Sequence, residues 1–304
     1  MKWDRIIFGL VLAVMGLTGC ASPPVAEGES PSDRALYDGK PAYLSDNLFP
    51  VQSAEDAVSK ADAALQGGDT DLALLYYIRA LEMDESSYEA AYKIGQIHMR
   101  RKNYRLAQMA FQLIPDSDSK YAGGLEGLGI IQLENRKYDD AEKLFAKAID
   151  ADHQRWEAHN GLGVIADLRN QHATAQSHYE VALNYKPESA LVLNNLGYSK
   201  YLSGEWYAAL EHFRVVVNFD PGFERAWMNM GLIHTRQEQY RQALDDFRHI
   251  MDEAHANNNV GYIALVDGRY KEAEYFLREA IRLSPKYFPA ANENLERVNA
   301  LRGN

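Results

Sequence analysis

The chain has 304 residues, of which 46% are hydrophobic and 25% are charged, and this composition is that of an ordinary folded protein rather than a disordered or fibrous one. Its formal net charge of −11 argues against nucleic acid as a partner, because phosphate binding needs clustered lysines and arginines, and it disfavours anionic membrane surfaces. The one cysteine, Cys20, excludes an intramolecular disulfide and a zinc site built on thiolates.

The first twenty residues have the pattern of an export signal. Lys2 and Arg5 form a short basic start, and residues 6–17 form an apolar run that is too short to span a bilayer as a permanent helix. The run ends in Leu17-Thr18-Gly19-Cys20, which resembles a bacterial lipobox. The resemblance implies cleavage after residue 19 and acylation of Cys20, so we expect 1–19 to be a lipoprotein signal peptide. The alternative is an ordinary signal peptide with an incidental cysteine.

The segment that follows is predicted to be a tether. Bacterial lipoproteins of this kind carry several acyl chains, which anchor a protein stably where one chain would not. Ala21 directly after the cysteine favours, by resemblance to Gram-negative sorting, the outer membrane with the protein facing the periplasm. Residues 20–53 are rich in proline, serine and acidic residues and lack periodicity, so we expect a flexible coil that reaches roughly 30 Å.

The rest of the chain repeats with a period of 34 residues. Small residues recur at this spacing at Ala61, Gly95, Gly129, Gly163, Gly197 and Gly231. An alanine follows each of them by twelve positions, at Ala73, Ala107, Ala141, Ala175, Ala209 and Ala243. An aromatic residue lies four positions further on, at Tyr77, Phe111, Phe145, Tyr179, Phe213 and Phe247. A seventh unit keeps the pattern with Gly261, Ala273 and Leu277, after a shorter step.

These units resemble the tetratricopeptide repeat, whose signature is Leu-Gly in a first helix and Ala with Phe in a second, as in Leu128-Gly129 and Leu162-Gly163. The resemblance implies an all-α fold, a TPR superhelix (α-solenoid) of about seven helix-turn-helix repeats over 54–287. The aromatic residue should fill the space between neighbouring pairs. We expect repeats at 54–87, 88–121, 122–155, 156–189, 190–223, 224–253 and 254–287, and a C-terminal capping helix within 288–304.

Two departures from the repeat predict local irregularity. Pro115 follows Ile114 directly and should end the second helix of the second repeat early. The sixth repeat lacks four residues around 249–253, which should tighten its link to the seventh.

Motifs of known catalytic chemistry are missing from the repeats. We find no glycine-rich phosphate loop, no Gly-x-Ser-x-Gly turn and no His-Glu-x-x-His pair. His153 with His159, and His172 with His178, are six apart and therefore do not share one helix face. We therefore predict a chain that is no enzyme, with no cofactor, no metal and no small-molecule substrate. The alternative, an enzyme, would need a catalytic site embedded in helix surfaces.

Asparagines mark the predicted binding groove, which the first helices of the repeats should line on the concave side. Asn195, Asn229 and Asn259 each stand two residues before the landmark glycine, although asparagine forms helices poorly. In related superhelices an asparagine at this place holds the backbone of an extended peptide. The alternatives are residue reuse after repeat duplication, or a bond to the adjoining helix. The predicted partner-binding residues are Asn194, Asn195, Asn229, Asn258, Asn259, Tyr198 and Tyr262.

The closing block, Ala256 to Ile263 followed by Gly268, Ala273-Glu274 and Leu277, resembles the C-terminal repeats of the TadD-like tight-adherence (Flp) pilus assembly lipoproteins. The resemblance implies a scaffold that binds a secretin or other pilus components. Two other interpretations stay open: a pilotin-like lipoprotein of a type IV pilus or type II secretion system, and a periplasmic adaptor for cell-wall enzymes.

Overall fold

The computed structural model describes residues 33–39, 50–284 and 286–302. The predicted signal peptide and the predicted acylation site, Cys20, lie outside the described residues. The described part of the chain contains no helix that is both long and apolar enough to cross a membrane.

The regular structure of the described residues is helical, and its main body is a series of seven antiparallel helix pairs. The pairs are α2 (Ala54–Gln66) with α3 (Thr70–Met83), α4 (Tyr88–Arg100) with α5 (Tyr104–Phe111), α6 (Ala122–Glu134) with α7 (Tyr138–Ala151), α8 (Trp156–Leu168) with α9 (His172–Tyr185), α10 (Ala190–Leu202) with α11 (Trp206–Phe219), α12 (Glu224–Arg236) with α13 (Tyr240–Arg248), and α14 (Glu253–Val266) with α15 (Tyr270–Leu283). Short 3₁₀ helices, η1 (Asp33–Leu36) and η3 (Ser119–Tyr121), precede α2 and α6. The predicted all-α solenoid is confirmed.

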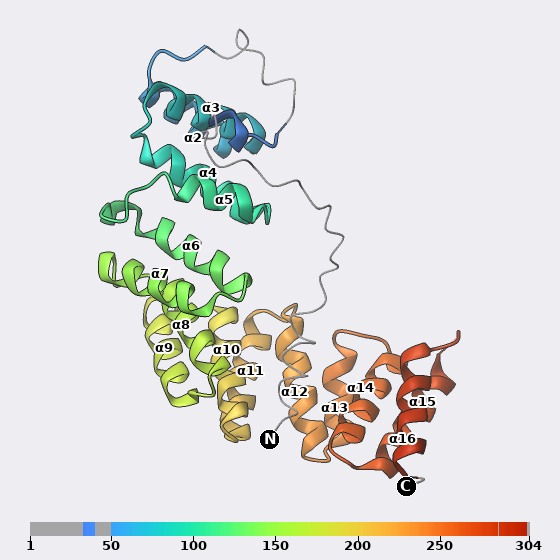
Figure 1. Ribbon diagram of the computed structural model, residues 1–304. Helices are drawn as coiled ribbons and strands as arrows, with labels where there is room; N and C mark the ends of the chain where they lie inside the picture. Colours follow the sequence, from blue (N-terminus) through green and yellow to red (C-terminus); the bar gives the residue numbers. More distant parts are fainter. Residues whose placement is uncertain (1–32, 40–49, 285, 303–304) are drawn as a thin grey trace.

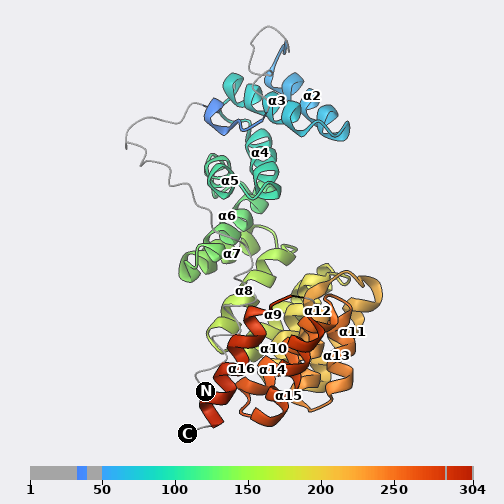
Figure 2. The same cartoon turned by 90° about the vertical axis from the view of Figure 1, so that its right-hand side faces the viewer.

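The pairs stack in chain order from α2 at one end to α16 (Pro289–Arg302) at the other (Figure 1). The array bends along its length. In Figure 1 α2 to α11 descend on one side, and α12 to α16 turn away from that line. In the view turned by 90° the later helices overlap in projection, and α2 to α7 extend beyond them (Figure 2). Ala291 and Val298 of α16 are fully buried against the last pair, so this helix covers the apolar end of the stack.

Each turn inside a repeat contains one residue in the left-handed region of backbone space. In three turns it is a glycine with φ between 76° and 85°: Gly68, Gly204 and Gly268. In the other four it is a residue with a side chain and φ between 58° and 61°: Lys102, Arg136, Asn170 and Glu238. The turn geometry is therefore common to all seven repeats, and four of them adopt it against the steric preference of an L-residue.

Aromatic residues fill the space between repeats, and the glycines leave room for them. Phe111 is buried between α4 and α6, where a Cβ added at Gly95 would lie 2.3 Å from its ring and one at Gly127 would lie 2.4 Å from it. Phe145 takes the same place between Gly129 and Gly161. The small residues are therefore required by the close approach of helices across an aromatic ring, as the period predicted.

The two departures from the repeat have local effects. Helix α5 ends at Phe111, ahead of Pro115, and η3 then leads into α6. Helix α13 ends at Arg248, and α14 begins at Glu253 after a short link.

The prediction of a flexible tether over 20–53 is wrong for residues 33–39. Leu36 is only 3% exposed and belongs to the core cluster of the first two repeats. The ring of His98, on α4, is fully buried and its Nε2 lies 2.8 Å from the carbonyl oxygen of Leu36. Asp38 forms an ion pair with Arg101 and accepts a hydrogen bond from Asn103. One leucine and one aspartate thus fix a short segment that has no helical periodicity of its own.

Candidate partner-binding face

The first helices of the repeats place equivalent residues in columns, and three columns define what we call the first-helix face. The first column follows each landmark small residue by one position and consists of Asp62, Gln96, Ile130, Val164, Tyr198, Leu232 and Tyr262. From the third repeat onward this column is apolar or aromatic, and its members are half-buried except Leu232, which is 7% exposed. The ring of Tyr198 packs 5.6 Å from that of Tyr201.

The second and third columns stand two and three positions before each landmark residue and carry the asparagines, which bond to one another between helices. Nδ2 of Asn195, on α10, donates to Oδ1 of Asn160, on α8, at 2.9 Å. Nδ2 of Asn229 donates to Oδ1 of Asn194 at 3.0 Å, and the same bond joins Asn294, on α16, to Asn258 at 3.3 Å. We call the asparagines in these three bonds the amide ladder. The three bonds join α10 to α8, α12 to α10 and α16 to α14.

Asn259 departs from the ladder because a methionine replaces its partner. At the position equivalent to Asn160 and Asn194 the sixth repeat has Met228, and Nδ2 of Asn259 lies 3.9 Å from its sulfur and 3.3 Å from the sulfur of Met251. A thioether is a weak acceptor, so this carboxamide retains most of its hydrogen-bonding capacity.

The amide ladder is a structural role for these asparagines: they bond to the adjoining helix, which is one of the alternatives that the sequence left open. A carboxamide has two donor hydrogens and an oxygen with two lone pairs, so one bond leaves capacity for a partner. Asn194 and Asn229 are only 5% and 8% exposed, whereas Asn195, Asn258 and Asn259 are half-buried. The second group is therefore accessible to a ligand, and its binding role stays a prediction. The sequence analysis missed Asn160 and Asn294, although Asn160 stands one period before Asn194.

In the third repeat, a glutamate occupies the position equivalent to Asn160 and Asn194. Glu126, on α6, is 5% exposed, and its Oε2 accepts the backbone N–H of Ala158 in the first turn of α8 at 3.1 Å. The guanidinium of Arg155 lies 3.8 Å from the other oxygen. Burial, reinforced by a hydrogen bond and repulsion from Glu157, raises the pKa of Glu126 to about 9. Glu126 therefore caps the next helix largely as a neutral acid.

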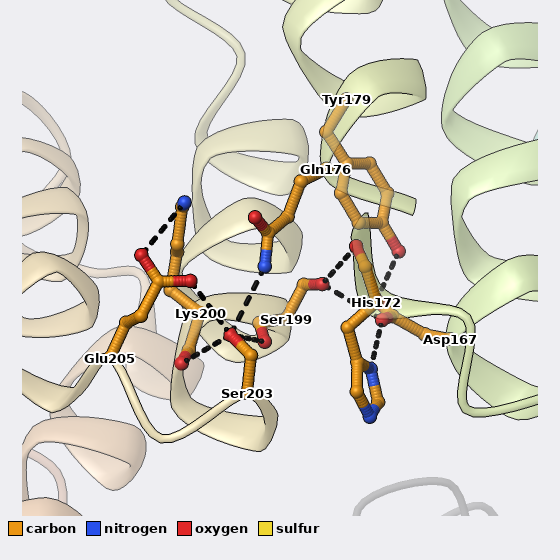
Figure 3. A network of polar contacts seen from close by, with 8 residues as sticks. All are labelled: Asp167, His172, Gln176, Tyr179, Ser199, Lys200, Ser203 and Glu205. Atoms are coloured by element: carbon orange, nitrogen blue, oxygen red, sulfur yellow. Dashed lines mark hydrogen bonds and ion pairs between the residues drawn. The ribbon is translucent and has the colours of Figure 1, made fainter. Parts of the chain in front are cut away.

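A polar network joins α8, α9 and α10 (Figure 3). The buried Asp167 accepts hydrogen bonds from the hydroxyl of Tyr179 at 3.0 Å and from that of Ser199 at 2.8 Å, and its Oδ1 lies 2.8 Å from Nδ1 of His172. Burial raises the pKa of Asp167 although these three bonds oppose the rise. The network continues through Gln176, Lys200, Ser203 and Glu205.

This network has the residue types of a hydrolase triad but not its geometry. In a triad the histidine accepts the proton of the serine hydroxyl. Here Ser199 donates to the carboxylate of Asp167 and, at 3.5 Å, to the backbone carbonyl of His172. The arrangement therefore links three helices and does not activate Ser199 as a nucleophile. Within residues 33–39, 50–284 and 286–302, no group of three or more histidine, cysteine or acidic side chains could hold a metal ion.

Comparisons with known proteins agree with this architecture. The tetratricopeptide repeat model matches residues 58–122, 127–183 and 237–288, which is more than half of the chain. The chain therefore belongs to the tetratricopeptide repeat family, whose fold is typically a non-catalytic scaffold for protein interaction. No curated protein sequence matches it.

Solved structures share the fold at low sequence identity. A tetratricopeptide repeat protein from Parabacteroides merdae is 15% identical with a TM-score of 0.56, and the match covers 82% of this chain and 99% of that one. PilW, a widely conserved type IV pilus biogenesis factor, is 19% identical with a TM-score of 0.55, over 70% of this chain and 99% of its own. PilF of Pseudomonas aeruginosa is 17% identical with a TM-score of 0.48, over 82% and 97%.

Proposed function

We propose that this chain is a non-catalytic, lipid-anchored scaffold of the outer membrane that binds partner proteins or extended peptides through the first-helix face of its last four repeats. The observation that carries the proposal is the pairing, on one face, of accessible carboxamides with an apolar column. Asn195 and Asn259 offer donors and acceptors, and Tyr198 and Tyr262 stand three residues further along the same helices. An extended peptide presents matching backbone amides and alternating side chains.

The affinity of a partner depends on both the carboxamides and the apolar column. Three amide contacts at about 0.5–1.5 kcal/mol each amount to a few kcal/mol, which corresponds to roughly millimolar binding. Burial of apolar side chains against Tyr198 and Tyr262 supplies the remainder, at about 25 cal/mol per Å². We therefore expect a partner segment with apolar residues at alternate positions.

The process that we propose is the assembly or secretin localisation of a tight-adherence (Flp) pilus. The support is the likeness of the closing block, residues 256–285, to the C-terminal repeats of the TadD-like lipoproteins, together with the lipobox that ends at Cys20. The likeness to PilW is a likeness of fold alone. It supports the proposal because the same fold occurs in a pilus biogenesis factor. A pilotin-like role, or an adaptor role for cell-wall enzymes, is an outcome of the test below.

The test places a photo-crosslinking amino acid at Tyr198 in the acylated protein in its own membrane, and the captured proteins are identified by mass spectrometry. The matched control carries the same amino acid at Tyr207, on α11, which is 79% exposed. Capture of a secretin or other Flp pilus component from position 198 and not from 207 supports the proposal. Capture of cell-wall hydrolases, or of components of another secretion system alone, contradicts the Flp assignment.

The anchor is tested separately. Cys20→Ser removes the predicted acylation site, so the variant should leave the membrane pellet after cell lysis and fail to incorporate radiolabelled palmitate. A variant that still sediments with the outer membrane would contradict the proposed anchor and would leave the binding face untouched.

A further inference from the structure

The second helices of the first two repeats hold a segment of the chain that is part of neither repeat. The 3₁₀ helix η1 packs against α3 and α5, and residues 37–39 follow it outside any helix. The side chain of Leu36 is buried and belongs to the core cluster of these two repeats. The segment therefore lies on the repeats in the manner of a bound peptide, and we call the place where it lies the segment groove.

The imidazole of His98, on α4, recognises the backbone of this segment. Burial lowers the pKa of His98, so the ring is neutral at pH 7. Its Nε2 donates to the carbonyl oxygen of Leu36 at 2.8 Å, which leaves Nδ1 as an acceptor. Nδ1 is buried without a hydrogen-bond partner among the described residues, and Oδ2 of Asp38, 3.6 Å away, is an acceptor too. The segment therefore satisfies one ring nitrogen of two, and a ligand with a donor at this place would satisfy both.

Arg101 and Asn103, in the turn between α4 and α5, recognise a carboxylate. One guanidinium nitrogen of Arg101 pairs with Asp38, and the other donates to Oδ1 of Asp71, on α3, at 2.6 Å. Nδ2 of Asn103 donates to the second oxygen of Asp38 at 3.2 Å. Because Asp71 belongs to the repeats, it orients the guanidinium independently of the segment. The repeats therefore supply a built site for one carboxylate.

The residue after this aspartate is restricted by the closeness of α3. A Cβ added at Gly39 would lie 2.7 Å from the hydroxyl oxygen of Tyr37 and 3.0 Å from the Cβ of Asp71. Only glycine fits there without a shift of its neighbours. The segment groove thus selects a leucine, an aspartate and a glycine in the pattern Leu-x-Asp-Gly.

We propose that the segment groove is a second binding site, which takes a Leu-x-Asp-Gly segment of a partner polypeptide in exchange for the chain's own residues 36–39. The chain's own segment shows which chemistry fits: an apolar side chain in the core cluster, a backbone carbonyl on His98 and a carboxylate on Arg101. The segment lies outside the helix pairs, so its release breaks no helix of the repeats and a partner can compete for the groove. None of these residues belongs to the first-helix face, so the inference is independent of the proposed function.

The test measures binding of a fluorescent peptide with the sequence of residues 33–39 to the full mature chain by fluorescence anisotropy. In the chain, Leu36→Ser/Asp38→Ser weakens the contacts of its own segment and so empties the groove. The peptide should bind this emptied chain about tenfold more tightly than the unaltered chain, in which the tethered segment competes at an effective concentration of about 1 mM. Circular dichroism establishes that the helical fold is kept, and Asp38→Ser alone, which retains Leu36, should give an intermediate affinity.

Further changes locate the peptide on the emptied chain. Arg101→Gln should weaken binding about tenfold, because it removes the charge-assisted bond to the aspartate of the peptide. The matched control, Arg225→Gln, removes the same charge from an exposed position of α12 and should change the affinity less than about twofold. A peptide with serine in place of leucine should show no measurable binding, since it loses the apolar contact.

Three results would overturn the proposal. The first is an emptied chain that does not bind the peptide, or binds it no better than the unaltered chain does, because the peptide would then lie elsewhere. The second is equal weakening by Arg101→Gln and Arg225→Gln, which would mean that only net charge attracts the peptide. The third is undiminished binding of the peptide that has serine in place of leucine.

Discussion

Asn229 donates a side-chain hydrogen to Oδ1 of Asn194, 3.0 Å away and 35 positions earlier in the chain, and both side chains are buried. The bond joins α12 to α10, so it couples two adjacent repeats. Buried carboxamides depend on each other strongly, because either one alone is an unsatisfied polar group.

Asn229→Ala should therefore lower the free energy of unfolding by about 1–3 kcal/mol, since it leaves Asn194 buried without its partner. The matched control is Asn218→Ala, at an exposed position of α11, which should be neutral or slightly stabilising. Urea unfolding followed by circular dichroism measures both. The double variant Asn194→Ala/Asn229→Ala completes a cycle, and additive effects of the two single changes would show that the pair does not interact.

Arg136 adopts φ of 60° at the turn position where three other repeats have glycine. Arg136→Gly should stabilise the protein by about 0.5–1 kcal/mol, because relief of the left-handed strain exceeds the entropy that glycine adds to the unfolded chain. The reverse change at the equivalent turn, Gly204→Arg, should destabilise by about the same amount. Thermal unfolding of the two variants tests the pair, and a loss of stability in Arg136→Gly would contradict the argument.

Gly161 lies against the ring of Phe145, and a Cβ added there would be 2.4 Å from the ring. Gly161→Ala should destabilise the junction of the third and fourth repeats by about 1–3 kcal/mol through overpacking, in spite of the better helix propensity of alanine. Gly67→Ala is the control, because its added Cβ would meet nothing nearer than 3.4 Å at ordinary helical angles. Equal stability of the two variants in urea would show that the ring moves aside at little cost.

Part of the structure follows from the sequence because it depends on contacts that recur with the chain period. Phe111 between Gly95 and Gly127, and the early end of α5 ahead of Pro115, are of this kind. The docking of Leu36 is not, because a four-residue 3₁₀ helix has no periodicity and its stability comes from the distant His98 and Arg101. The hydrogen-bond acceptor of Asn195 does not follow from the sequence pattern either. A helix position predicts which column a side chain joins, whereas the bond to Asn160 depends on the offset between adjacent repeats.

The pH dependence of stability tests whether Glu126 is protonated in the folded chain. Its pKa in the folded chain is raised to about 9, far above its ordinary value of 4.5. The folded state therefore holds a proton that the unfolded chain releases, and the stability associated with this proton is complete below the unfolded pKa. It is lost progressively as the pH rises from there through the folded pKa.

Glu126→Gln keeps an oxygen for the backbone N–H of Ala158 and cannot ionise, so it should remove this loss. Urea midpoints of the variant and of the unaltered chain should be similar at about pH 5 and should separate by about pH 8, where the variant is the more stable. Histidines titrate in the same window, but they are common to both proteins and cancel in the difference. The control Glu296→Gln, at an exposed position of α16, should show no such separation. Midpoints of Glu126→Gln that run parallel to those of the unaltered chain across this range would mean that Glu126 is ionised in the folded state and that Arg155 balances its charge.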